Sequence, residues 1–162
     1  DPCFFISGLK DSKKLAPRRR EELGELIRQH SLAFCIAQAS VEEIDTFNIL
    51  NATFMAMQRA ISGLDKVPDL ALIDGNRIPP LPVPAKAIVK GDVSEPAISA
   101  ASILAKVERD RIILNYHQTW PMYRFDLHKS YATRTHLELL TKFGPLSIHR
   151  RSFSPVAKAC LL

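Results

Sequence analysis

The sequence is poor in cysteine and glycine, and it has no long apolar run. Its 3 cysteines are scattered at Cys3, Cys35 and Cys160 without a C-x-x-C motif, which argues against a disulfide framework and a zinc site. Its 6 glycines form no nucleotide-cradling loop, so a phosphotransferase of another kind lacks its usual signature. No stretch approaches the roughly 18 apolar residues of a membrane span, and no signal segment is recognisable. We therefore expect a cytoplasmic protein with reduced thiols that does not enter a membrane.

The chain does have length, apolar content and a positive charge. Its 162 residues, 46% of them hydrophobic, are enough for one domain with a sizeable core, so we expect 1–162 to form a single domain. The net charge of +5 favours a polyanionic partner such as nucleic acid, although ordinary basic enzymes share it. The abrupt start on Asp-Pro, without Met, suggests processing or the loss of preceding residues.

Helical and strand-like segments alternate along the chain. Helical spacing of apolar residues predicts helices over 12–31, 40–64, 95–120 and 135–144. Short apolar runs predict strands over 32–40, 69–75 and 85–91. Ser12 is the candidate N-cap of the first helix. Ser40 and Glu43 form a capping box for the second, which is expected in two pieces, and Gly63 and Gly144 are stop signals. The alternation is typical of an α/β or α+β layered fold.

Two of the strand-like runs lead into an acid. "LALIDGN" (70–76) contains Asp74 and "AIVKGD" (87–92) ends on Asp92. Sites in open α/β sheets form beyond the carboxyl ends of strands, so neighbouring strands would bring the carboxylates together. Two close carboxylates repel unless a cation such as Mg²⁺ or Mn²⁺ joins them. The alternative is a plain turn, the commoner role of Asp-Gly, and a two-metal site would need further acids.

Three basic segments are candidates for phosphate binding. Lys13 and Lys14 lie at a predicted helix start, where the helix dipole favours anions, or they are simply solvated. "RFDLHKSYATRTH" (124–136) surrounds Tyr131 with basic residues, which suits sugar stacking and phosphate contact, or it is a surface loop with one anchored Tyr. "HRRSF" (149–153) is either a phosphate patch or a solvated face.

Taken together, these motifs resemble bacterial ribonuclease HII, the type 2 ribonuclease H, in the family's order and over nearly the whole chain. The segments that carry the resemblance are "GLKDSKKL" (8–15), "NILNAT" (48–53), "MAMQRA" (55–60), "LIDGNR" (72–77), "AIVKGD" (87–92), "ISAASILAKVERDR" (98–111), "HKSYAT" (128–133) and "HRRSF" (149–153). The resemblance implies a ribonuclease H-like α/β fold, a mixed sheet flanked by helices, in a protein that acts as a monomer.

The resemblance also implies an activity. The family cleaves the RNA strand of RNA–DNA hybrids and cuts 5′ of single ribonucleotides embedded in duplex DNA, leaving 3′-hydroxyl and 5′-phosphate ends, in the repair of misincorporated ribonucleotides. Four acids hold Mg²⁺ or Mn²⁺ for two-metal hydrolysis. Asp74 and Asp92 match the acids of the family's "DGN" and "KGD" segments. Lys13 and Lys14 would then hold backbone phosphates, and Tyr131 matches the Tyr that stacks on the sugar beyond the cut.

The sequence departs from the family pattern in two places. The D-E-x-G-R-G motif, which carries the other two acids and helps to read the ribose 2′-hydroxyl, has no counterpart and would precede residue 1. We therefore expect this chain by itself to be inactive or very weak. Ser130 and Ala132 stand where many relatives have Gly, which permits backbone angles that Ser and Ala avoid.

A non-catalytic nucleic-acid-binding domain is the rival interpretation. It predicts hybrid binding that weakens steeply with salt, and no metal-dependent turnover. Asp74→Asn separates the two, because only an enzyme has cleavage to lose.

Overall fold

The computed structural model describes residues 6–9 and 11–160, which divide into two compact units. The first unit contains the chain up to Gln38 together with Phe54–Glu108, and the second contains Ala39–Thr53 together with the chain from Arg109 onward. Two helices belong to both units, α2 (Val41–Ser62) and α4 (Pro96–Thr119). The single-domain prediction concerns independent folding and stays a prediction.

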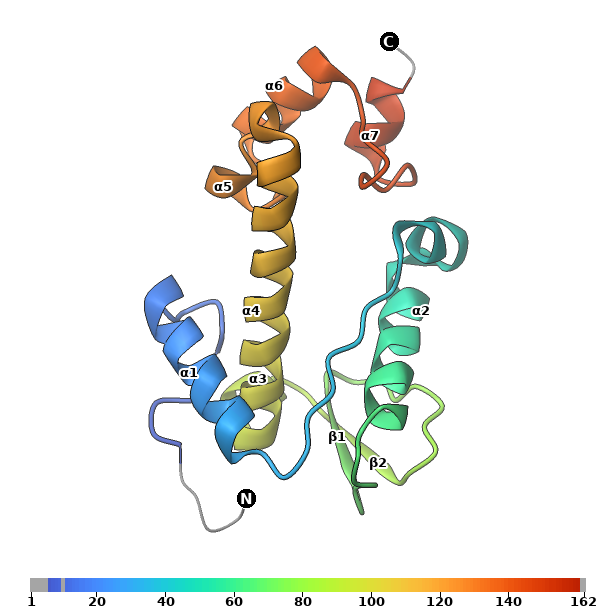
Figure 1. Ribbon diagram of the computed structural model, residues 1–162. Helices are drawn as coiled ribbons and strands as arrows, with labels where there is room; N and C mark the ends of the chain where they lie inside the picture. The colour runs from blue at the N-terminus through green and yellow to red at the C-terminus, as the bar shows by residue number, and fades with distance from the viewer. Residues whose placement is uncertain (1–5, 10, 161–162) are drawn as a thin grey trace. The chain divides into compact units, whose positions relative to one another are not determined.

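The first unit packs helix α1 (Pro17–His30) against the N-terminal part of α4 (Figure 1). Leu23 of α1 and Ile103 of α4 are fully buried at the centre of this contact. Gly24 permits the close approach, since a Cβ there would lie 3.3 Å from Val107 of α4. The lack of a side chain at Gly24 therefore lets α1 lie close against α4.

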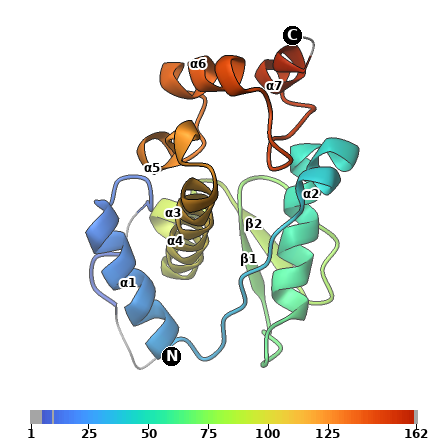
Figure 2. The same ribbon diagram turned by 45° about the horizontal axis from the view of Figure 1, so that its top comes forward.

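A two-stranded parallel sheet also belongs to the first unit. It consists of β1 (Ala71–Asp74) and β2 (Ala85–Ile88), with Asp74 opposite Ile88 in the register. Figure 2 shows the two strands side by side. Both strands lie within predicted strand segments, and the proline-rich loop of residues 75–84 joins them. The two strands therefore finish at the same edge, which is the arrangement that a shared site needs.

Two sequence-based predictions for the first unit are wrong. The helix expected from Ser12 begins only at Pro17, a residue suited to the first helical position. The Ser12 hydroxyl instead contacts the Ser102 hydroxyl of α4 at 2.9 Å. Residues 32–40 form no strand in the part of the chain that the structure describes, since β1 and β2 pair with each other and give this segment no ladder.

Helix α2 confirms the prediction of a helix in two pieces. Ser40 and Glu43 cap each other, with 2.8 Å from Ser40 N to Glu43 Oε2 and 3.1 Å from Glu43 N to Ser40 Oγ. Asn48 interrupts the helix with φ 67, and its Oδ1 accepts the backbone N–H groups two and three residues on. The interruption is therefore also the N-cap of the second piece, and the helix ends directly before Gly63, as predicted.

The second unit is helical throughout its described elements. They include η1 (Pro121–Tyr123), α5 (Phe125–His128), α6 (Arg134–Phe143) and α7 (Ser154–Ala159). Tyr123 and Phe125 are almost fully buried, and their rings stack with centroids 5.4 Å apart. Gly144, with φ 75, ends α6 as predicted. Among the described helices, none combines the length and apolarity needed to span a membrane.

Candidate active site

Asp74 lies at the exposed carboxyl end of β1, where the sheet finishes. The backbone N–H of Gly75 donates to the Ile88 carbonyl at 2.9 Å, so the hydrogen bonds between β1 and β2 continue to the end of the sheet. One carboxylate oxygen of Asp74, Oδ1, accepts a hydrogen bond from the backbone N–H of Gly91 at 2.9 Å. This bond fastens the first acid to the turn that leads into the second.

Asp92 lies one residue beyond that hydrogen bond, in the first turn of the short helix α3 (Gly91–Ser94). The strand-like run stops before the acid, because Lys90 turns the chain with φ 59. The Asp92 carbonyl accepts the hydroxyl of Ser99 on α4 at 2.7 Å. The structure therefore brings Asp74 and Asp92 to one edge of the sheet, although Asp92 belongs to a helix and not to the end of a strand.

The two carboxylates supply the oxygen donors that hard divalent cations prefer. Asp74 uses Oδ1 for the Gly91 N–H, which leaves its Oδ2 as a donor for a metal. Among the described residues, no group of three or more His, Cys, Asp or Glu side chains has the arrangement to hold a metal ion. In its chemistry the pair fits a hard divalent cation such as Mg²⁺ or Mn²⁺.

Lys13 and Lys14 lie in an exposed turn before α1, not at the helix start that was predicted. The Asp11 side chain accepts the Lys13 N–H at 2.9 Å, and the Asp11 carbonyl accepts the Lys14 N–H at the same distance. Buried Arg20 donates to the carbonyls at both ends of the turn, Ser12 at 2.8 Å and Leu15 at 2.9 Å. The turn is therefore firmly held while both ammonium groups point into solvent.

One face of α4 anchors both Asp92 and the lysine turn. Ser99 holds the Asp92 carbonyl, and Ser102, one helical turn later, contacts Ser12. Ser12 and Ser99 are both buried. The sequence-based predictions gave Ser99, Ser102 and Arg20 no part in holding the candidate site. The single signal for these roles is the run of Ser and Ala at the start of the helix.

Tyr131 lies in the second unit, on the loop between α5 and α6. Its side chain is 54% exposed, and the Arg109 guanidinium lies 4.6 Å from the ring centroid. That distance suits a cation–π contact. Arg109 thus backs the ring, while more than half of the residue's surface remains exposed to solvent.

The loop before Tyr131 contains backbone angles that favour glycine. Lys129 has φ 47 and Ser130 has φ 62, whereas Ala132 does not have a positive φ. We expect Ser130→Gly to raise the free energy of unfolding by about 0.5–1 kcal/mol, because Gly tolerates this conformation without a Cβ penalty. Urea denaturation measures this change in the free energy of unfolding. Ala132→Gly is the matched control and should be neutral or destabilising, and equal gains from both variants would contradict the explanation.

Three buried histidines surround this loop: His128, His136 and His149. The rings of His128 and His136 stack with centroids 4.3 Å apart. Burial lowers the pKa of His136, and burial followed by the nearby His136 lowers the pKa of His149 to about 4. His136 and His149 therefore stay neutral near pH 7, well above the pKa of His149.

The "HRRSF" segment is fixed by Asp45 of α2. One oxygen of this carboxylate accepts the Arg151 N–H at 2.8 Å, and the other accepts the N–H and the hydroxyl of Ser152. These bonds, the Ser152 hydroxyl first among them, hold the pKa of Asp45 below its usual range. Arg150 lies over the Phe153 ring at 5.2 Å. Part of the segment is therefore structural, and its role in phosphate binding stays a prediction.

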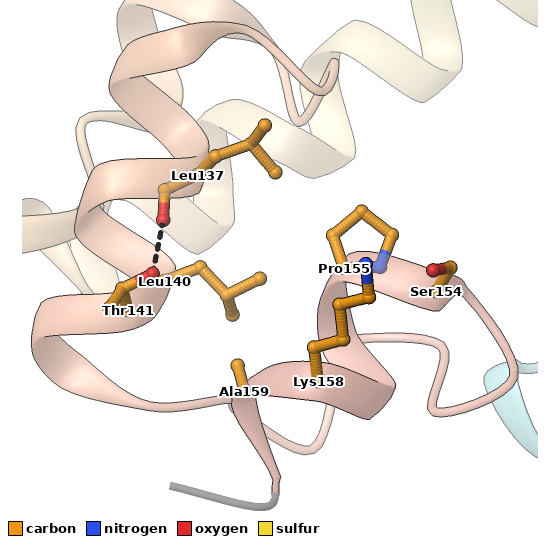
Figure 3. Close-up of a pocket in the computed structure, with 7 residues that line it drawn as sticks. All are labelled: Leu137, Leu140, Thr141, Ser154, Pro155, Lys158 and Ala159. Carbon is orange, nitrogen blue, oxygen red and sulfur yellow. Dashed lines mark hydrogen bonds between the residues drawn. The ribbon is translucent and has the colours of Figure 1, made fainter.

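A cavity of about 300 Å³ lies between α6 and α7 (Figure 3). Leu140 and Pro155 give it an apolar lining, and Lys158 adds a single charge. Thr141, also in the lining, donates its hydroxyl back to the Leu137 carbonyl at 3.0 Å. No predicted site residue lines this cavity, so the candidate site is the exposed edge with Asp74 and Asp92.

Comparison with known proteins assigns a family. The family profile described as Ribonuclease HII matches residues 3–156. A Ribonuclease HII of Idiomarina loihiensis is 55% identical over 158 residues, which cover 98% of this chain and 84% of the relative. A Ribonuclease HII of Burkholderia thailandensis is 56% identical over 159 residues, covering 98% of this chain and 74% of the relative.

Solved structures agree on the fold. The ribonuclease H2 from Pyrococcus horikoshii matches with a TM-score of 0.76 at 24% identity, over 94% of this chain and 80% of that one. The RNase HII of Archaeoglobus fulgidus, solved in a complex with PCNA, matches with a TM-score of 0.65 at 27% identity over the same shares. The expectation of a ribonuclease H-like α/β fold is confirmed.

Proposed function

This chain belongs to the ribonuclease HII family of endoribonucleases, which act on RNA–DNA hybrids, and from that premise we propose its specific reaction. The protein cleaves the RNA strand of hybrids, and it also nicks duplex DNA on the 5′ side of a single embedded ribonucleotide. The products carry 3′-hydroxyl and 5′-phosphate ends. The observation that supports this proposal most is the 2.9 Å hydrogen bond from Gly91 to Asp74, because it brings the two acids to one edge.

Asp74 and Asp92 are the proposed ligands of catalytic Mg²⁺ or Mn²⁺. Bound divalent ions supply an activated water and stabilise the leaving 3′ oxygen. The Gly91 N–H orients the Asp74 carboxylate, and Ser99 holds the backbone of Asp92, so neither acid has to be ordered when substrate arrives. The negative charges of the two carboxylates hold cations where the substrate phosphate binds.

Lys13, Lys14 and Tyr131 are the proposed substrate contacts. The two exposed ammonium groups bind backbone phosphates without reading sequence. Tyr131 stacks on the sugar beyond the cut, with Arg109 behind its ring. In this proposal the protein acts as a monomer in the cytoplasm, on ribonucleotides misincorporated into DNA.

If Lys13 and Lys14 bind phosphates, replacing them should change how steeply the affinity for nucleic acid depends on salt. In Lys13→Gln/Lys14→Gln, the slope of log affinity against log salt should fall in magnitude by about 2, since each phosphate contact contributes about 0.9. Titrating a labelled RNA–DNA hybrid at several salt concentrations measures the slope. The control Lys66→Gln/Lys158→Gln changes two exposed lysines elsewhere and removes the same charge. An equal change of slope in both double variants would assign the effect to net charge and refute the specific contact.

We further propose that the 162-residue polypeptide by itself has little or no activity. It contains two of the four acids that the family resemblance implies, Asp74 and Asp92. Fusing a segment with the family's Asp-Glu motif ahead of residue 1 should raise cleavage by about 10²-fold or more. Equal rates with and without that segment would show that the two acids suffice.

The proposed activity is tested with two duplexes that differ in one 2′-hydroxyl. The chain with the Asp-Glu segment fused ahead of residue 1, called the full-length protein below, should in Mg²⁺ or Mn²⁺ nick the duplex that contains one ribonucleotide and leave the all-DNA duplex intact. Equal cleavage of both duplexes would refute ribonucleotide specificity. Salt-dependent binding without cleavage of either duplex or of a hybrid would favour the non-catalytic binding domain.

A further inference from the structure

The backbone of Tyr131 is held by a chain of two buried histidines. His136 Nδ1 lies 3.0 Å from the Tyr131 carbonyl oxygen, and His136 Nε2 lies 3.3 Å from His149 Nε2. The backbone N–H of Leu146 donates to His149 Nδ1 at 2.9 Å. Both rings are only 7% exposed, so water does not compete freely for these bonds.

The two backbone ends determine the direction of every hydrogen bond in this chain. The Leu146 N–H can only donate, so His149 Nδ1 accepts, and a neutral His149 must carry its proton on Nε2. That N–H donates to His136 Nε2, which places the His136 proton on Nδ1. His136 then donates to the Tyr131 carbonyl, which can only accept. Both rings must be neutral, because an extra proton on either would set two donors against each other.

The third histidine acts on the residue just before Tyr131. His128 Nδ1 accepts the Ser130 N–H at 3.2 Å, and His128 Nε2 lies 2.7 Å from the Tyr123 carbonyl. Its ring stacks on His136. The hydrogen bond from the Ser130 N–H to His128 therefore stabilises the left-handed conformation of Ser130, and His136 holds the carbonyl of the following residue, Tyr131.

The surroundings favour neutral rings. The groups that face His136 and His149 are each other, the rings of Phe125 and His128, and Tyr123, whose centroid lies 5.6 Å from that of His149. Among the described residues, no ion pair involves either of the two rings. With no carboxylate to stabilise an imidazolium, the hydrogen-bonded arrangement persists at neutral pH.

We propose that His136 and His149 are positioning residues for substrate register: their directional hydrogen-bond chain sets the backbone of Tyr131 and so the place of its ring on the substrate sugar. The inference rests on the role proposed for Tyr131 above. Neither histidine touches the substrate in this account. Loss of the hydrogen bond from His136 to the Tyr131 carbonyl should therefore impair the discrimination between substrates more than cleavage itself.

The test uses two nearly isosteric variants of the full-length protein. His136→Asn keeps a donor at the position of Nδ1, whereas His136→Leu has the same shape without a donor. The readout is kcat/KM for the single-ribonucleotide duplex divided by kcat/KM for an RNA–DNA hybrid. We expect this ratio to fall about three- to tenfold in His136→Leu and to stay within about twofold in His136→Asn. Val156→Ala, which loses buried methyl groups in α7, controls for lost stability and should leave the ratio unchanged.

A second measurement does not depend on activity or on variants. Imidazole ¹⁵N NMR of the unmodified protein at pH 7 should show His149 protonated on Nε2 and His136 on Nδ1, and the opposite tautomers would overturn the chain. Tyr131→Ala separates the two proposals. If it lowers the ratio and His136→Leu does not, the positioning role alone is refuted. If it leaves the ratio unchanged, the proposed role of Tyr131 is refuted, and the positioning role with it.

Discussion

Asp74→Asn should lower metal-dependent cleavage by the full-length protein by about 10³-fold or more, because it removes the charge of a proposed metal ligand, and such a ligand is worth several kcal/mol in the transition state. The amide oxygen of Asn can still accept the Gly91 N–H that the carboxylate accepts at 2.9 Å, so the edge of the sheet keeps its geometry. Binding should survive or tighten, since one negative charge near the substrate phosphate is gone. Single-turnover cleavage and a binding titration on the same hybrid measure the two effects.

Asp69→Asn is the matched control for that experiment. Asp69 is an exposed acid two residues before β1. Its replacement by Asn changes the net charge by the same amount as Asp74→Asn, but outside the proposed site. The cleavage rate of Asp69→Asn should stay within about twofold of that of the unmodified protein, as expected for a surface substitution. Equal losses in both variants would assign the effect to net charge, and full activity in Asp74→Asn would remove Asp74 from the metal site.

Phe125→Ala should cost about 3–5 kcal/mol of unfolding free energy. Phe125 is fully buried at the centre of the second unit's aromatic cluster. Its ring centroid lies 5.4 Å from that of Tyr123 and 5.7 Å from that of His136, so truncation leaves a cavity beside the histidine chain. The total free energy of unfolding of a typical domain is about 5–15 kcal/mol, so this is a large loss of stability. Urea denaturation followed by circular dichroism gives the value.

Phe143→Ala removes the same ring from a position that is 45% exposed. It should cost about 1 kcal/mol or less, because little apolar surface leaves the core. Similar losses in the two variants would contradict the account of Phe125 as the centre of the cluster. A loss at Phe125 without any change in the imidazole signals of His136 and His149 would show that the cluster does not support the histidine chain.

The parts of the fold that the sequence predicts are those with local signals. Ser40 and Glu43 form the capping box that their spacing indicates, and Gly144 ends α6. β1 and β2 follow from apolar runs between turn residues. In each case the interactions that determine the structure lie within a few residues of one another along the chain.

The failures involve partners that are distant in sequence. Ser12 has the chemistry of a helix cap, but Ser102, ninety residues away, takes its hydroxyl. Residues 32–40 have an apolar pattern compatible with a strand, yet a strand also needs a free edge to pair with, which composition cannot reveal. Asp92 was expected at the end of a strand and lies in α3, because the left-handed turn at Lys90 is not visible in the pattern.

The candidate site likewise has features that the sequence predicts and features that it does not. The strand pair explains from the residues alone why Asp74 comes close to Asp92, whereas the preference for a metal role over a plain turn came from the family resemblance. Arg20 and the chain from His149 through His136 to Tyr131 gave no signal in the sequence, since their partners are mostly backbone groups, which every residue carries and no pattern of side chains marks. Such supporting contacts are where a structure adds most to a motif.

The chemistry of the product ends tests the central claim most directly. The full-length protein, in Mg²⁺, is given a DNA duplex with one ribonucleotide, and the products are weighed by mass spectrometry. If Asp74 and Asp92 hold the metal that activates water, the upstream strand ends in a 3′-hydroxyl and the ribonucleotide carries a 5′-phosphate on the downstream strand. A 2′,3′-cyclic phosphate on the ribonucleotide would mean that its own 2′-hydroxyl attacked, and it would contradict the account.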